Sequence, residues 1–123
     1  MNQIIRLFFL NCVFIAIVQT SEANPLPPAP DIKTGQKIFE KHCKVCHGLT
    51  GDGATFAANA LNPPPRNFTS AASKKELTAE RMLASVFKGR KGTAMMPWEG
   101  VLSKQEIHSA VLYIRKKLMH LPE

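Results

Sequence analysis

The pentapeptide Cys43-Lys44-Val45-Cys46-His47 restricts the fold of this chain more than any other feature. On a helical turn, residues three apart lie on one face, so the two sulfur atoms can reach the same flat group. A CxxC pair followed at once by histidine is the pattern of c-type haem attachment, with two thioether bonds and an axial histidine. We therefore predict one covalent haem c per chain, with His47 as a ligand of its iron.

Two other uses of a CxxC pair compete with this interpretation. A structural zinc site needs four protein ligands, so the pair would have to recruit His108 or His120 from the far end of the chain. A redox-active dithiol of the thioredoxin kind expects a βαβ context, and the sequence contains no strand pattern. Haem attachment explains more of the chain than either alternative.

The N-terminus predicts export. Residues 1–23 combine an early arginine, an apolar run and small residues at the end, which is the pattern of a secretory signal cleaved after Ala23. The apolar run falls short of the roughly 20 residues of a spanning helix, although an uncleaved anchor remains the alternative. Residues 24–30 form a proline-rich tether, and residues 31–120 form the domain. We predict a periplasmic location, with membrane association only through partners or an uncleaved signal.

The charge pattern predicts the kind of partner. The chain carries a formal net charge of +7, and its cations are scattered without interleaved aromatic residues. Together with the export signal, this excludes a nucleic-acid-binding protein as a useful hypothesis. Acidic redox partner proteins fit better, because complementary fields raise encounter rates without a large interface. We predict a monomer.

Hydrophobic periodicity predicts three helices and no strand. The first covers residues 32–42 and runs into the cysteine motif. The second starts after an N-cap at Thr78 and stops at Gly89. The third starts at a Ser103–Glu106 capping box and carries an apolar stripe to Leu118. The segment 48–73, rich in Gly, Asn, Pro and Ser, is predicted to be a long loop around a cofactor.

The second axial ligand is less certain from the residues alone. The candidates are Met82, Met95, Met96, Met119, His42, His108 and His120. Methionines at helical positions are more often core residues than ligands. The segment 92–98, GTAMMPW, lies between two predicted helices and can turn a thioether toward an iron. This leaves Met95 and Met96 as the main candidates.

The chain resembles the class I c-type cytochromes over nearly all of residues 24–123. The features that carry the resemblance are the helix with Gly35 and Phe39, CKVCH, the proline-rich loop, GTAMMPW, and a last helix with Ala110 and Tyr113. The resemblance implies an all-α, cytochrome c-like fold with three to four helices around one haem. It also implies that Gly35 packs against Ala110, with Phe39 and Tyr113 nearby.

The same resemblance suggests roles for further residues. Two family registers select Met95 as the axial ligand, whereas the habit of methionine directly before proline selects Met96. The resemblance assigns the hydrogen-bond acceptor of His47 to the carbonyl of Pro63 or Pro64, and Arg66 suits a haem propionate. Trp98 is expected to pack on the haem. The expected apolar wall consists of Phe68, Leu61 and Val101.

With both axial positions filled by protein, no open site is left for a substrate. The sequence also lacks a catalytic triad, paired carboxylates or a phosphate loop. We therefore predict a one-electron carrier between redox complexes and not an enzyme. The alternatives are a permanent electron-transfer subunit of a periplasmic dehydrogenase or oxidase, and a haem-based sensor of small ligands.

Overall fold

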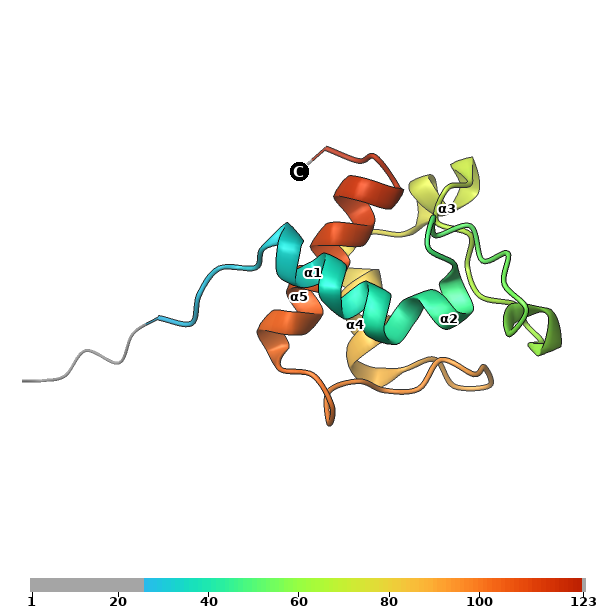
Figure 1. The fold of residues 1–123 in the computed structure, drawn as a ribbon, viewed down its shortest axis with the longest axis horizontal. Helices are drawn as coiled ribbons and strands as arrows, with labels where there is room; N and C mark the ends of the chain where they lie inside the picture. The colour runs from blue at the N-terminus through green and yellow to red at the C-terminus, as the bar shows by residue number, and fades with distance from the viewer. Residues whose placement is uncertain (1–25, 123) are drawn as a thin grey trace, which may run out of the picture.

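The computed structural model describes residues 26–122. The predicted signal sequence and its cleavage point lie outside the described residues. Within residues 26–122 the chain is helical, with no strand, and every helix is too short or too polar to span a membrane. The elements are α1 (Ile32–Ile38), η1 (Phe39–Cys43), α2 (Lys44–His47), η2 (Ala58–Ala60), α3 (Ala71–Glu76), α4 (Ala79–Lys88), α5 (Lys104–Tyr113) and η3 (Ile114–Leu118) (Figure 1).

The N-terminal helical stretch leads directly into the cysteine motif, as predicted. It starts at Asp31, whose carboxylate accepts the backbone N–H of Thr34 at 2.8 Å. That hydrogen bond is the main reason why the pKa of Asp31 lies below its usual value. α1 then passes through η1, a π-helical turn, into α2. Single π-helical turns inside α-helices occur frequently at functional sites, and this one ends on Cys43.

α1 and α5 cross in close contact at Gly35. A Cβ atom on Gly35 would lie 1.9 Å from the carbonyl oxygen of Ser109 and 2.8 Å from Cβ of Tyr113. The atoms nearest to such a Cβ thus belong to the carbonyl of Ser109, which faces α1, and to Tyr113, whereas the predicted packing of Gly35 against Ala110 stays a prediction. The rings of Phe39 and Tyr113 lie 5.6 Å apart, as the resemblance implied.

The second and third predicted helices are confirmed with their caps. The hydroxyl of Thr78 accepts the N–H of Arg81 at the start of α4, and Gly89 ends that helix with φ of 67°. Ser103 and Glu106 form the predicted capping box at the start of α5. These ends are fixed by residues within one turn, which is why the sequence predicts them well.

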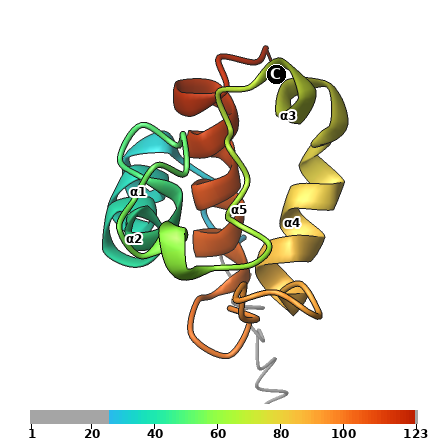
Figure 2. The ribbon, with the colours of Figure 1, turned by 90° about the vertical axis from the view of Figure 1, so that its right-hand side faces the viewer.

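The predicted loop 48–73 is shorter than expected. A helix that the sequence reading missed, α3, begins at Ala71 after Ser70, whose hydroxyl accepts the N–H of Ser73 at 3.1 Å. The guanidinium of Arg115, in η3, donates to the carbonyl of Leu77 at 2.8 Å and ties the α3–α4 junction to the C-terminal helix. Figure 2 shows α5 in the middle, with α1 and α2 on one side and α4 on the other.

The core has two parts. The main cluster consists of Phe39, Phe68, Leu77, Met82, Val111, Tyr113, Ile114, Leu118 and Met119. The smaller cluster consists of Ile38, Leu102, Ile107 and Ala110, with Trp98 packed against it. Met82 and Met119 are thus core residues, as their helical positions suggested.

Candidate haem site

The two cysteines of the motif lie in adjoining helical elements, Cys43 at the end of η1 and Cys46 in α2. Both are free thiols and partly buried. Burial is the largest cause that raises the pKa of Cys43, to about 11, and the neighbouring Cys46 adds to it. A redox-active dithiol needs a lowered thiol pKa, so the environment of Cys43 does not support the thioredoxin-like alternative.

His47 is held on two sides. Its ring stacks on Phe68, with centroids 4.6 Å apart and planes 14° from parallel. Its Nδ1 lies 3.3 Å from the carbonyl oxygen of Arg66, which leaves Nε2 as the nitrogen for an iron. Burial lowers the pKa of His47, and the hydrogen bond to Arg66 opposes this in part. The neutral imidazole, which is the ligating form, is therefore favoured.

The acceptor for His47 is the carbonyl of Arg66, and the prediction of Pro63 or Pro64 is wrong in this structure. The chain after the prolines returns to the motif loop, where the N–H of Phe68 donates to the carbonyl of Gly51 at 2.7 Å. This pairing places the Arg66 carbonyl at the imidazole, while Pro63 and Pro64 are exposed.

The side chain of Arg66 has a partner that the sequence did not reveal. Its guanidinium forms an ion pair with the carboxylate of Glu76 at the end of α3. Both side chains are about half exposed. The predicted contact of Arg66 with a haem propionate therefore competes with this ion pair.

The segment after α4 buries one of the two candidate methionines. The N–H of Arg90 donates to the carbonyl of Met95 at 2.9 Å, and the N–H of Met95 donates to the hydroxyl of Thr93 at 3.1 Å. In this turn Met95 is partly buried, whereas Met96 is 50% exposed. Burial therefore favours Met95 over Met96 as the inward thioether.

Trp98 connects this segment to the cysteine motif. Its backbone N–H donates to the backbone carbonyl of Val86 at 2.9 Å. Its ring meets that of His42, the residue before Cys43, edge to face at 5.2 Å. Trp98 therefore brings the Met95 segment and the Cys43 end of the motif to the same region of the molecule.

The other candidate residues differ in how far they are buried. Phe68 is buried, Leu61 is partly buried and Val101 is 58% exposed, and their place in an apolar wall around the haem stays a prediction. His108 lies against Phe87, and His120 is exposed. Among the described residues, no cluster of three or more His, Cys, Asp or Glu side chains could hold a metal ion.

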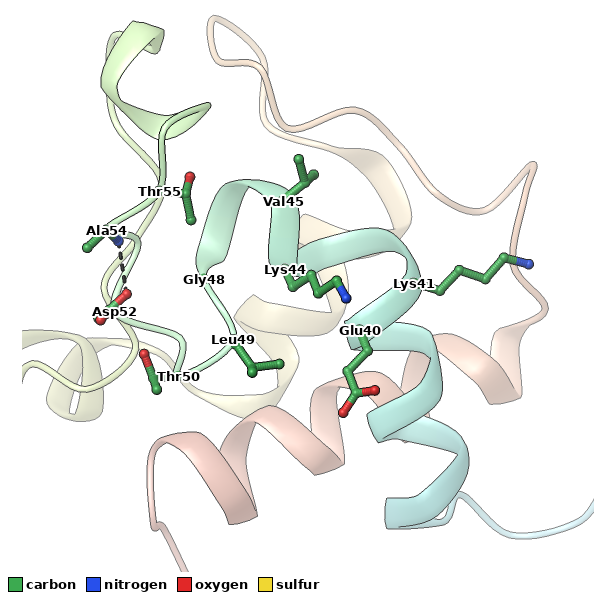
Figure 3. Close-up of a pocket in the computed structure, with 10 residues that line it drawn as sticks. All are labelled: Glu40, Lys41, Lys44, Val45, Gly48, Leu49, Thr50, Asp52, Ala54 and Thr55. Atoms are coloured by element: carbon green, nitrogen blue, oxygen red, sulfur yellow. Dashed lines mark hydrogen bonds between the residues drawn. The ribbon is translucent and has the colours of Figure 1, made fainter.

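A hollow of about 560 Å³ lies behind the motif, between η1–α2 and the loop 48–55. Figure 3 shows Lys44 and Val45, the two residues between the cysteines, at its edge. Cys43, Cys46, His47 and Met95 do not line it. The hollow is thus separate from the proposed iron ligands.

The donor set fits a covalently bound haem. It comprises two free thiols at the required spacing, an imidazole oriented through Nδ1, and the partly buried Met95 on a segment tied to the motif through Trp98. An all-helical domain with these features defines a c-type cytochrome.

Comparison with known proteins agrees with that class. Residues 30–114 match the family model described as cytochrome c oxidase, cbb3-type, subunit III. The chain is 33% identical to cytochrome c6 of Leptolyngbya boryana over 87 residues, which cover 71% of this chain and 93% of that protein.

Solved structures show the same fold. The c-type cytochrome KustC0563 superposes with a TM-score of 0.58 and 28% identity, covering 66% of this chain and 93% of that one. Cytochrome c6 of the diatom Phaeodactylum tricornutum gives a TM-score of 0.57 at 23% identity, over 73% and 97% of the two chains. The chain belongs to the cytochrome c family. It carries haem c with its iron, and its function is electron transfer, as a carrier and not as an enzyme.

Proposed function

We propose that this protein carries single electrons between redox complexes, with Cys43 and Cys46 bonded to the haem and His47 and Met95 as the axial ligands. The observation that carries this proposal is the fixed orientation of His47, set by the Arg66 carbonyl at Nδ1 and by the ring of Phe68. Both restraints act on the imidazole without using Nε2, which is the geometry of an axial histidine.

Each of these residues has a distinct task. The iron supplies the one-electron chemistry when the haem is bound. His47 offers its lone pair in the neutral form, because burial lowers its pKa. Phe68 covers one face of the imidazole and keeps water away from it. A methionine opposite a histidine raises the reduction potential, so Met95 suits a carrier that accepts electrons readily.

The net charge of +7 supports acidic redox partners for this carrier. The pattern of residues 1–23 supports export to the periplasm. We propose a monomer, because a mobile carrier works through small, transient interfaces. Residues 31–120 stand as the proposed boundaries of the haem domain.

A second candidate is a permanent electron-transfer subunit of an oxidase or dehydrogenase. The match to a family model described as an oxidase subunit favours this alternative. Gel filtration of the native extract separates the two, because a free carrier elutes at the size of the single chain. Co-elution with a large oxidoreductase would replace the carrier by the subunit.

The haem ligands are tested by mass and by absorption spectra. A mass equal to the bare polypeptide would overturn covalent attachment. Met95→Ala should remove the methionine–iron absorption band of the oxidised protein, and Met96→Ala is the matched control that keeps it. Loss of the band only in Met96→Ala would make Met96 the ligand. Ready binding of carbon monoxide by the reduced wild type would favour a sensor of small ligands.

A further inference from the structure

The hydrogen bond between His47 and the Arg66 carbonyl is sensitive to small movements. Nδ1 of His47 lies 3.3 Å from the carbonyl oxygen, which is longer than the roughly 2.9–3.0 Å of most N–H···O hydrogen bonds. A further displacement of a few tenths of an ångström would take the oxygen to roughly 3.6 Å, where a hydrogen bond no longer exists. The orientation of His47 therefore depends on what fixes the backbone at Arg66.

The loop after the motif supports this backbone on one side. The backbone N–H of Gly53 donates to the backbone carbonyl of His47 at 2.8 Å, which keeps Gly53 beside the histidine. A Cβ on Gly53 would lie 3.2 Å from the carbonyl oxygen of Pro65 and 3.8 Å from that of Arg66. Gly53 thus limits how closely Pro65 and Arg66 can approach the motif. It does not hold Arg66 against movement in the other direction.

The side chain of Arg66 reaches a junction of three helical elements. Its guanidinium forms an ion pair with the carboxylate of Glu76, the last residue of α3. The guanidinium of Arg81, in α4, donates to the backbone carbonyl of Glu76 at 3.4 Å. That of Arg115, in η3, donates to the carbonyl of the next residue, Leu77, at 2.8 Å. Glu76 is therefore tied to α4 and η3 and offers Arg66 a fixed partner.

We propose that Glu76 is a positioning residue, which holds the Arg66 carbonyl on Nδ1 of His47 through its ion pair with Arg66. The inference rests on the proposed function, because it takes His47 as the axial ligand of the haem iron. An acceptor at Nδ1 makes the imidazole a stronger donor and so stabilises ferric over ferrous iron. Glu76 thereby keeps the reduction potential of the carrier lower than it would be without the ion pair.

The exposure of the ion pair sets the size of the effect. The side chains of Arg66 and Glu76 are 44% and 48% exposed, and exposed ion pairs contribute little to the stability of a fold. Removing this pair should therefore leave the helices intact. It should still act on His47, because the long hydrogen bond at Nδ1 responds to a small displacement of the carbonyl.

The test follows the exchange of the Nδ1 proton of His47 with deuterium oxide, by NMR of the reduced, haem-loaded protein. Glu76→Ala and Arg66→Ala should each exchange about threefold faster than wild type, as expected for the loss of an exposed ion pair. Arg66→Lys keeps the cation and should stay within about 1.5-fold of wild type. The matched control is Glu40→Ala, which removes the same charge in η1, where the carboxylate accepts from Gln36 at 2.8 Å; it should also stay within about 1.5-fold.

The double variant, Glu76→Ala with Arg66→Ala, separates positioning from a simple effect of charge. Its net charge equals that of wild type, so loss of the direct field of the two groups would leave the reduction potential nearly unchanged. Positioning instead predicts a higher potential, with exchange about threefold faster than wild type and no faster than in either single variant. A wild-type potential together with wild-type exchange would overturn the proposal.

Other outcomes separate the role of Glu76 from the proposed ligation. Faster exchange in Arg66→Ala but not in Glu76→Ala would overturn the role of Glu76 and assign Arg66 to a haem propionate. Reduced wild type without ring-current-shifted resonances of His47 would overturn the proposed ligation itself. Unchanged exchange rates in the presence of those resonances would overturn only the role of Glu76. Wild-type absorption spectra and urea unfolding midpoints are expected in all variants and would show that the fold is intact.

Discussion

Replacing Gly35 by alanine tests how tightly α1 and α5 pack. The new Cβ would lie 1.9 Å from the carbonyl oxygen of Ser109 and 2.6 Å from its carbonyl carbon. Both atoms belong to the backbone, so no side-chain rotation relieves the contact, and the helices must separate. The separation would also weaken the hydrogen bond from the N–H of Asp31 to the buried hydroxyl of Ser109, now 3.1 Å long.

The magnitude follows from two opposing terms. Overpacking of a rigid contact costs up to about 3 kcal/mol, and the upper end applies because backbone atoms block the new group. Alanine in place of glycine within a helix returns about 1 kcal/mol. We expect Gly35→Ala to lower the free energy of unfolding by about 2 kcal/mol, which corresponds to a fall in Tm on the order of 10 °C for a domain of this size.

The assay is urea unfolding of the haem-loaded protein, followed by circular dichroism. Gly100→Ala is the matched control, since a Cβ there meets nothing within 4 Å; it should change the stability by less than about 0.5 kcal/mol. Faster hydrogen exchange at the amide of Asp31 should accompany the loss in Gly35→Ala. Equal stability of the two variants would refute the close α1–α5 contact.

Three further changes test other parts of the fold. Gly89→Ala should cost more than about 1 kcal/mol in urea unfolding, because Gly89 has φ of 67° and a Cβ would lie 2.6 Å from the carbonyl oxygen of Met95; no loss would show that the turn adapts. Glu106→Ala should cost up to about 1 kcal/mol at pH 7. Hydrogen bonds from Ser103 lower the pKa of Glu106 in the fold. The stabilisation by the Glu106 carboxylate is therefore present above its unfolded pKa and is lost as the pH falls through its folded pKa. A difference in stability between wild type and Glu106→Ala that persisted at pH 2 would contradict the capping role. Phe68→Ala should cost about 3 kcal/mol or more and shift the haem absorption spectrum, because Phe68 is buried and stacks on His47; an unchanged spectrum would argue against the orienting role of Phe68.

The sequence determined the features that depend on residues within one helical turn. The spacing of Cys43, Cys46 and His47 sets the haem-attachment pattern by itself, because helix geometry fixes the relation between positions three and four apart. The starts of α4 and α5 are set by Thr78 and by the Ser103–Glu106 box, whose hydrogen bonds are local. These predictions needed no knowledge of the rest of the fold.

Tertiary structure decided which distant groups meet. The Arg66 carbonyl, and not that of Pro63 or Pro64, reaches His47 because the loop is fixed by the contact of Phe68 with Gly51. The ion pair of Arg66 with Glu76 depends on α3, which one serine cap starts within a segment of loop-like composition. Whether Met95 or Met96 is buried depends on how the turn folds back on Gly89. Such contacts join residues whose distance is set by the path of the chain between them, and a local sequence pattern carries no information about that path.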